Sequence, residues 1–156
     1  MPGYRMHIVG GIAAYGITLS ILSLYSRYFH PSTPVLAEWL IFAVAGSLFP
    51  DIDTRSKGSS WFNKLIPILG VLCLVSRMYV LLGVLSIMWI LPYLATHRGT
   101  FHRVWFVVLA PLGLAYFLGL HFPSYTRIFY YDAAFFITGA LSHLWLDLGF
   151  KRMIRI

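Results

Sequence analysis

Long apolar stretches run through the whole chain and limit the folds that it can adopt. Of the 156 residues, 59% are hydrophobic and only 11% are charged. A single water-soluble core would leave too little polar surface to cover so much apolar material. A helix of about 20 apolar residues, in contrast, crosses the hydrocarbon layer of a membrane. The sequence therefore predicts an all-α, polytopic transmembrane helical bundle that forms a single integral membrane domain over residues 1–156.

Six hydrophobic segments are expected, separated by polar or proline-containing links. They comprise residues 8–25, 35–49, 65–75, 79–95, 101–120 and 130–150. The third segment is short, so it is either a short or tilted crossing or a re-entrant element packed inside the bundle. Residues 51–64, which are polar and contain Gly58-Ser59-Ser60, are expected to form the longest hydrophilic loop.

The 12 basic residues are divided unevenly between the two sides of the predicted bundle. Three of them, Arg27, Arg77 and Arg127, fall on one side, and the other nine fall on the side where the first segment begins. By the positive-inside rule, both termini are then cytoplasmic. Because these residues sit at segment ends and not along one continuous face, their positive charge does not predict a nucleic-acid partner.

Three short motifs at the segment ends gather acidic residues and histidines. They contain three of the five acidic residues and three of the six histidines, namely Asp51, Asp53, His97, His102, His143 and Asp147. If residues 65–95 leave one side of the membrane and return to it, all three motifs lie on the same, cytoplasmic side. His7, at the start of the first segment, falls on this side too.

The spacing within each motif allows two interpretations. His143 and Asp147 are four residues apart, so a helix puts both on one face, where they could bind an ion or merely hydrogen-bond to each other. Asp51 and Asp53 repel each other unless a cation lies between them, although both could be solvated. His97 and His102 flank a tight link between two segments, or are ordinary interfacial histidines.

Together these motifs predict a metal site. Its expected ligands are His7, Asp51, Asp53, His97, His102, His143 and Asp147, with His7 the weakest candidate because it could simply end the first helix. Nitrogen and oxygen donors, with Cys73 as the only cysteine, suit zinc, and manganese or iron(II) as alternatives. Seven ligands exceed the needs of one ion and predict two divalent transition-metal ions, which can clamp an ester or phosphoester oxygen.

Other polar residues near the motifs have roles that complement such a site. We expect Asp53, His102, Arg98 and Arg55 to take part in catalysis, and Ser56, Lys57 and Arg103 to bind substrate. Guanidinium and hydroxyl groups beside metal ions can hold an anionic headgroup or stabilise developing negative charge.

The motifs also resemble those of a known family. Pro50-Asp51-Ile52-Asp53 with Ser56, His97-Arg98-Gly99 followed by His102, and Ser142-His143 followed by Asp147 are similar to the YdjM-like family of inner-membrane predicted metal-dependent hydrolases. The resemblance spans nearly the whole chain, and Phe101 stands where a threonine is common in the family. It implies a bacterial or archaeal inner membrane and a hydrolytic reaction.

The function expected from these features is a membrane-embedded metal-dependent hydrolase. Its site at the cytoplasmic face would act on a phosphoester or ester of a membrane lipid, with the bilayer as its surroundings. A metal-dependent lipid amidase, a metal or proton transporter, and a scaffold with a structural metal are the alternatives. Transport would require polar residues through the membrane midplane, and the centres of the predicted spans are apolar. The sequence indicates no particular oligomeric state.

Overall fold

The chain folds into helices joined by short links. The computed structural model describes residues 3–25, 29–52, 57–94 and 100–153, and this part of the chain contains six α-helices and no strands. The α-helices are α1 (Tyr4–Tyr25), α2 (Thr33–Leu48), α3 (Lys57–Val75), α4 (Tyr79–Leu94), α5 (Val104–His121) and α6 (Thr126–Met153). Three single-turn 3-10 helices are η1 (Phe49–Asp51), η2 (Thr100–His102) and η3 (Pro123–Tyr125). The predicted all-α helical class is confirmed.

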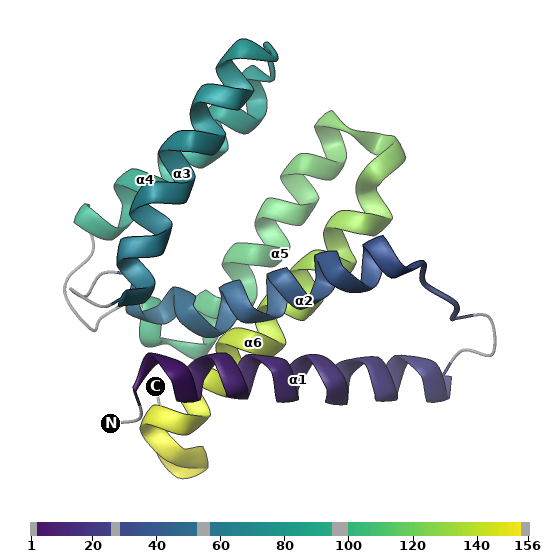
Figure 1. Cartoon of the computed structure of the whole chain (residues 1–156), viewed down its shortest axis with the longest axis vertical. Coiled ribbons are helices and arrows are strands. Elements are labelled where there is room, and N and C mark those ends of the chain that lie inside the picture. Colours follow the sequence, from purple (N-terminus) through teal and green to yellow (C-terminus); the bar gives the residue numbers. More distant parts are fainter. Residues whose placement is uncertain (1–2, 26–28, 53–56, 95–99, 154–156) are drawn as a thin grey trace.

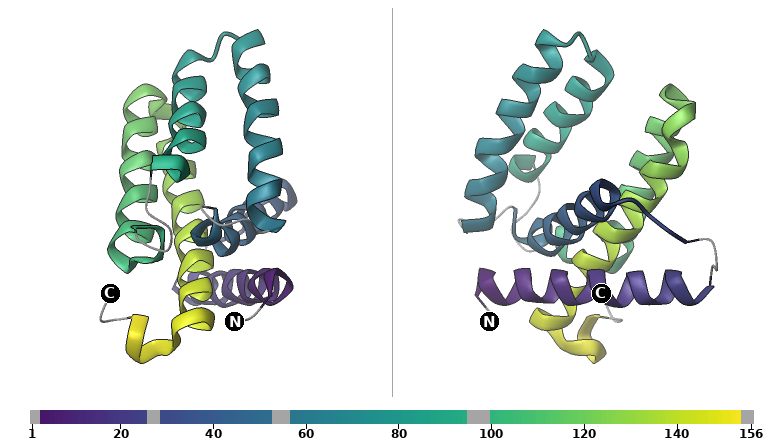
Figure 2. Two further views of the ribbon diagram at one scale, coloured as in Figure 1. Left: turned by 90° about the vertical axis from the view of Figure 1, so that its left-hand side faces the viewer. Right: turned by 45° about the vertical axis from the view of Figure 1, so that its right-hand side comes forward.

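Helix α6 is the centre of the molecule. It packs against α2, α5 and α1, whereas α3 and α4 pack chiefly on each other. Figure 1 shows α1 running across the molecule below α2, with the α3–α4 and α5–α6 hairpins extending away on the same side of it. The right-hand view in Figure 2 shows the α3–α4 hairpin standing apart from α5 and the first part of α6.

The most extensive helix contact is that between α2 and α6, and two glycines allow it. A Cβ atom at Gly46 would collide with the backbone carbonyl of Phe136, and one at Gly139 would collide with that of Ala43. Small residues at such positions let two helix backbones approach closely in a membrane protein. The close approach brings the end of α2 against the middle of α6.

A tight turn follows α2 at the end of the bundle where Asp51 lies. Pro50 has no backbone N–H group and so cannot continue the hydrogen bonds of α2, and the chain tightens there into η1. Phe49, Ile52 and Phe101 form a buried cluster at this point, and Phe62 of α3 and Leu91 of α4 pack against it. The start of α3 and the end of α4 thus lie at the same end of the bundle. The α3–α4 hairpin therefore brings the chain back to the end from which α3 starts.

The predicted loop over residues 51–64 is wrong in its second half. Helix α3 already begins at Lys57, and residues 65–75 are the later part of a helix of 19 residues. Ser59 is buried and Phe62 packs against the cluster of Phe49, Ile52 and Phe101. These tertiary contacts outweigh the weak helix propensity of the polar stretch. Leu65, Ile68 and Val71 are exposed, so this face of α3 is not packed inside the described part of the bundle. Whether α3 crosses the membrane stays a prediction.

A compact turn joins α3 to α4. Arg77 adopts a left-handed conformation with φ of 55°, and the Met78 amide donates a hydrogen bond of 2.8 Å to the Cys73 carbonyl. This hydrogen bond and the left-handed residue form the C-terminal motif that commonly ends α-helices. The turn reverses the chain within three residues, which makes α3 and α4 an antiparallel pair.

Within the described part of the chain, three helices are long and apolar enough to cross a membrane. They are Tyr4–Tyr25, Thr33–Asp51 and Val104–His121, whereas the apolar helices Ser59–Val75 and Tyr79–Tyr93 are shorter. Large apolar side chains such as Ile17, Leu24 and Ile41 are exposed, as expected where lipid tails surround a protein. The number of crossings and the cytoplasmic position of both termini remain predictions.

Candidate metal centre

His143, on α6, has one ring nitrogen fixed and the other free. The side chain is fully buried, and its Nδ1 lies 2.7 Å from the backbone carbonyl oxygen of Ser47 on α2. A carbonyl oxygen can only accept a hydrogen bond, so Nδ1 carries the proton and Nε2 keeps its lone pair. Nε2 is buried and has no hydrogen-bond partner among the described residues. Histidines that bind metals are held in this way, with the second nitrogen donating to a carbonyl.

Asp147 lies one turn after His143 on the same face of α6, as the spacing predicts. Its Oδ2 is 3.6 Å from His143 Nε2, and its Oδ1 is 3.4 Å from His7 Nε2. The side chain is 5% exposed. One carboxylate therefore faces two imidazoles, with a different oxygen toward each.

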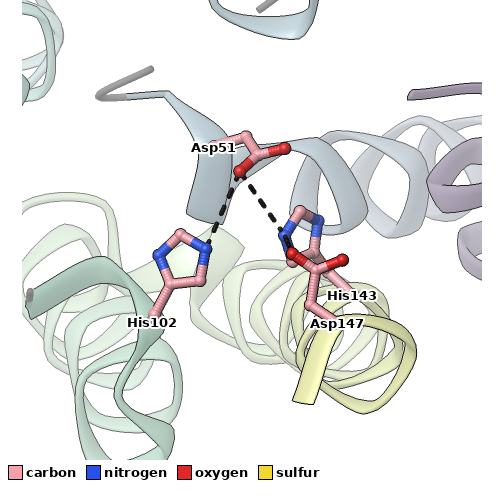
Figure 3. Close-up of side chains that lie close together, drawn as sticks. All are labelled: Asp51, His102, His143 and Asp147. Carbon is pink, nitrogen blue, oxygen red and sulfur yellow. Dashed lines mark ion pairs between the residues drawn. The ribbon is translucent and has the colours of Figure 1, made fainter. Parts of the chain in front are cut away.

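Asp51 and His102 complete a group of four side chains (Figure 3). Asp51 comes from η1 and His102 from η2, and Asp51 Oδ1 lies 3.7 Å from Nε2 of both His102 and His143. His102 is buried, while Asp51 is partly exposed. Three separate segments of the chain thus bring two carboxylates and two imidazoles together.

The spacing of these four side chains fits a metal ion better than it fits hydrogen bonds. One donor atom from each of Asp51, His102, His143 and Asp147 lies within 4.8 Å of the others. Separations of 3.6 and 3.7 Å exceed the range of N–H···O bonds. Around a tetrahedral zinc, ligands at their usual bond lengths are about 3.3–3.6 Å apart. The donors are all nitrogen and oxygen, a set that also suits manganese and iron(II).

His7, the weakest ligand candidate in the sequence, is buried beside the group of four and is not one of its members. It lies in the first turn of α1, is 2% exposed, and stacks on the His143 ring with 3.9 Å between ring centroids. Its Nδ1 is buried and has no hydrogen-bond partner within the described ranges. His7 stands beside the group of four and touches it through Asp147.

Several residues predicted for the site lie outside the described residues. These are Asp53, Arg55, Ser56, His97 and Arg98. Lys57 is the first residue of α3, but its side chain is not described either. Arg103 precedes α5, directly after His102, and its side chain is exposed.

Two features of the structure were missed by the sequence analysis. One is the Ser47 carbonyl that orients His143, and no sequence signal could have identified it because the contact is made by the backbone. The other is Asp132 on α6, a 6% exposed acid distant from the three motifs. Its signal was present in the sequence, since it is an isolated acid near the start of the apolar run over residues 130–150.

Comparison with known proteins places the chain by sequence alone. The family model described as YdjM inner membrane protein matches residues 1–156, which is the whole chain. No curated protein and no solved structure matches it. The chemistry of the site therefore follows from its own side chains.

Proposed function

The chain belongs to the YdjM inner membrane protein family, and from that premise we propose that it is a metal-dependent hydrolase acting on a phosphoester or ester of a membrane lipid. The observation that carries the proposal is the convergence of His143, His102, Asp51 and Asp147. The free Nε2 of His143, held in place by Ser47, supports a bound cation more directly than any other feature.

We further propose that the site holds two divalent ions, with zinc preferred. Asp147 supports this number, because its two oxygens face His143 and His7 separately and one carboxylate can bridge two ions. Asp53 and His97 would supply further donors for the second position. When bound, divalent ions of this kind polarise an ester or phosphoryl oxygen and lower the pKa of water to near neutrality.

Substrate binding in this proposal relies on the basic residues next to the ligands. Arg103 follows His102 directly, and Arg98, Arg55, Ser56 and Lys57 belong to the two motifs that supply Asp51 and His102. Cationic groups at these positions would hold an anionic headgroup while the apolar outer surface of the helices stays in lipid. This preference for anions favours phosphoesters over amides. The uneven distribution of basic residues supports a site at the cytoplasmic face.

The proposal is tested with protein purified without chelators and loaded with zinc or manganese. We expect it to hydrolyse at least one member of a panel of phospholipids, lipid phosphates and lipid amides. Asp147→Asn should lose both metal and activity. Arg103→Ala should keep the metal and lose roughly 10²–10³ in rate, the usual effect of removing a group that stabilises the transition state.

Arg77→Ala is the matched control, because Arg77 lies in the α3–α4 turn, away from the site. Both arginine variants remove one guanidinium from the protein, so an effect of charge alone would appear in both. Loss of metal in Arg103→Ala would contradict its role in substrate binding. Ion flux through proteoliposomes, with no lipid hydrolysed by metal-loaded protein, would replace the hydrolase with the transporter alternative.

A further inference from the structure

A buried acidic side chain lies away from the metal centre. Asp132 on α6 is buried, and its Oδ1 has no hydrogen-bond partner among the described residues. Eleven residues of helix separate it from His143, which is about 16 Å along the helix axis. It is therefore not part of the cluster around Asp51 and Asp147.

Asp132 lines a cavity that is otherwise apolar. The cavity has a volume of about 440 Å³, within the usual range for small-molecule sites, and lies among α2, α4, α5 and α6. Aromatic rings cover much of its wall, contributed by Phe42, Phe106, Phe117, Phe129 and Phe136. Ile87 of α4 and Phe117 of α5 line the cavity and are also exposed, so the cavity is open to the surroundings of the bundle.

Among the described residues, none forms an ion pair or hydrogen bond with the Asp132 carboxyl group. Glu38, the other acid on the helices around this part of α6, lies on α2, which packs on α6, and is partly buried. Arg127, which lies five residues before Asp132, is placed over the Tyr131 ring and forms no ion pair with either acid. A buried carboxylate without a partner is costly, and in membrane proteins such groups mark functional sites.

We propose that this cavity binds a lipophilic organic cation, such as a quaternary ammonium or phosphonium. The carboxylate of Asp132 would pair with the positive charge, and the phenylalanine rings would contact the apolar substituents. Aromatic faces attract cations of this kind, and the attraction increases when water is excluded. A metal ion fits poorly, because hard cations require several oxygen ligands and the cavity wall supplies only one carboxyl group.

The test measures binding of tetraphenylphosphonium to the full chain in lipid nanodiscs by equilibrium dialysis. Wild type should bind one equivalent, and Asp132→Asn, which keeps the shape of the side chain, should bind roughly tenfold more weakly or worse. Glu38→Gln should cause a smaller loss. His143→Ala should bind like wild type, because the metal centre is separate; this makes the result independent of the proposed hydrolase.

Triphenylmethanol, a neutral hydrogen-bond donor of similar shape, separates charge from hydrogen bonding. It should bind wild type much more weakly than the cation does. Leu114→Trp, which fills the cavity from α5, should block the cation even if Asp132→Asn fails to fold. Equal binding of the cation by Asp132→Asn and wild type would overturn the proposal. Tighter binding of triphenylmethanol than of the cation would overturn it as well.

Discussion

At the scale of single residues, orientation matters as much as identity. His143 is useful as a ligand because its Nδ1–H donates a hydrogen bond to the Ser47 carbonyl, which leaves the lone pair of Nε2 directed at Asp51 and Asp147. His7 has a different position, since it stacks on the His143 ring and, of the described acids, faces Asp147. Two histidines in one cluster should therefore contribute unequally to metal binding.

We expect His143→Ala to abolish binding of the metal, because it removes a ligand atom from the middle of the group. His7→Ala should weaken metal affinity by about 10–100-fold, the range found when a residue that supports a ligand is lost. Metal content after purification and affinity from zinc titration measure the two effects.

His121→Ala is the control for both variants. His121 is an exposed histidine at the end of α5. Its Nδ1 lies 3.0 Å from the carbonyl oxygen of Phe117. It should retain wild-type metal content and affinity. A wild-type result for His143→Ala would mean that the cluster is only a set of buried polar side chains.

At the scale of helices, the position of the site depends on how closely α2 and α6 cross. Gly46 and Gly139 allow the two backbones to touch, and Ser47, whose carbonyl orients His143, lies next to Gly46. Any side chain at the crossing would push the two helices apart. The ligands on α6 would then move away from Asp51, which follows α2.

Gly139→Ala should therefore destabilise the protein and reduce its metal content together. Overpacking of this kind costs about 1–3 kcal/mol, because the added Cβ meets backbone atoms that cannot rotate away. The thermal midpoint in detergent should fall and zinc affinity should drop.

Gly113→Ala is the matched control, because Gly113 on α5 has open space where a Cβ would be placed. It should leave the midpoint unchanged or raise it slightly, since alanine favours a helix more than glycine does. If Gly139→Ala were as stable as Gly113→Ala, the close crossing of α2 and α6 would be refuted.

At the scale of the whole molecule, the described ligands gather at one end of the bundle. The basic residues are distributed so that this end is predicted to face the cytoplasm. Ser60, at the start of α3, is exposed at the end that carries the site, and Ser124, in η3, is exposed where α5 meets α6.

Single cysteines at these two serines test the orientation. In a Cys73→Ala background, Ser60→Cys should react with a membrane-impermeant reagent only from the cytoplasmic side, and Ser124→Cys only from the outside. Labelling of both from the same side would contradict the predicted topology. Ser59 is unsuitable for this experiment because the structure buries it.

The sequence by itself determined the class of fold and most of the described site. Apolar segments of membrane length predict helices, because a bilayer leaves backbone groups no partner other than one another. The four-residue spacing of His143 and Asp147 predicts a shared helix face, since helical periodicity is a local property. Asp51 and His102 were identified because charged groups are rare in apolar chains and stand out where they occur.

Only the tertiary structure decided the features that depend on contacts between distant segments. The start of α3 at Lys57 follows from packing of Phe62 against Phe49 and Ile52, which local polarity does not reveal. The place of His7 beside Asp147 follows from the path of α1 across α6. Burial of Asp132 beside an apolar cavity depends on four helices at once. These features arise from the assembly of the helices: a local pattern can mark Asp132 as an unusual acid in an apolar run, but it does not say which helices surround it.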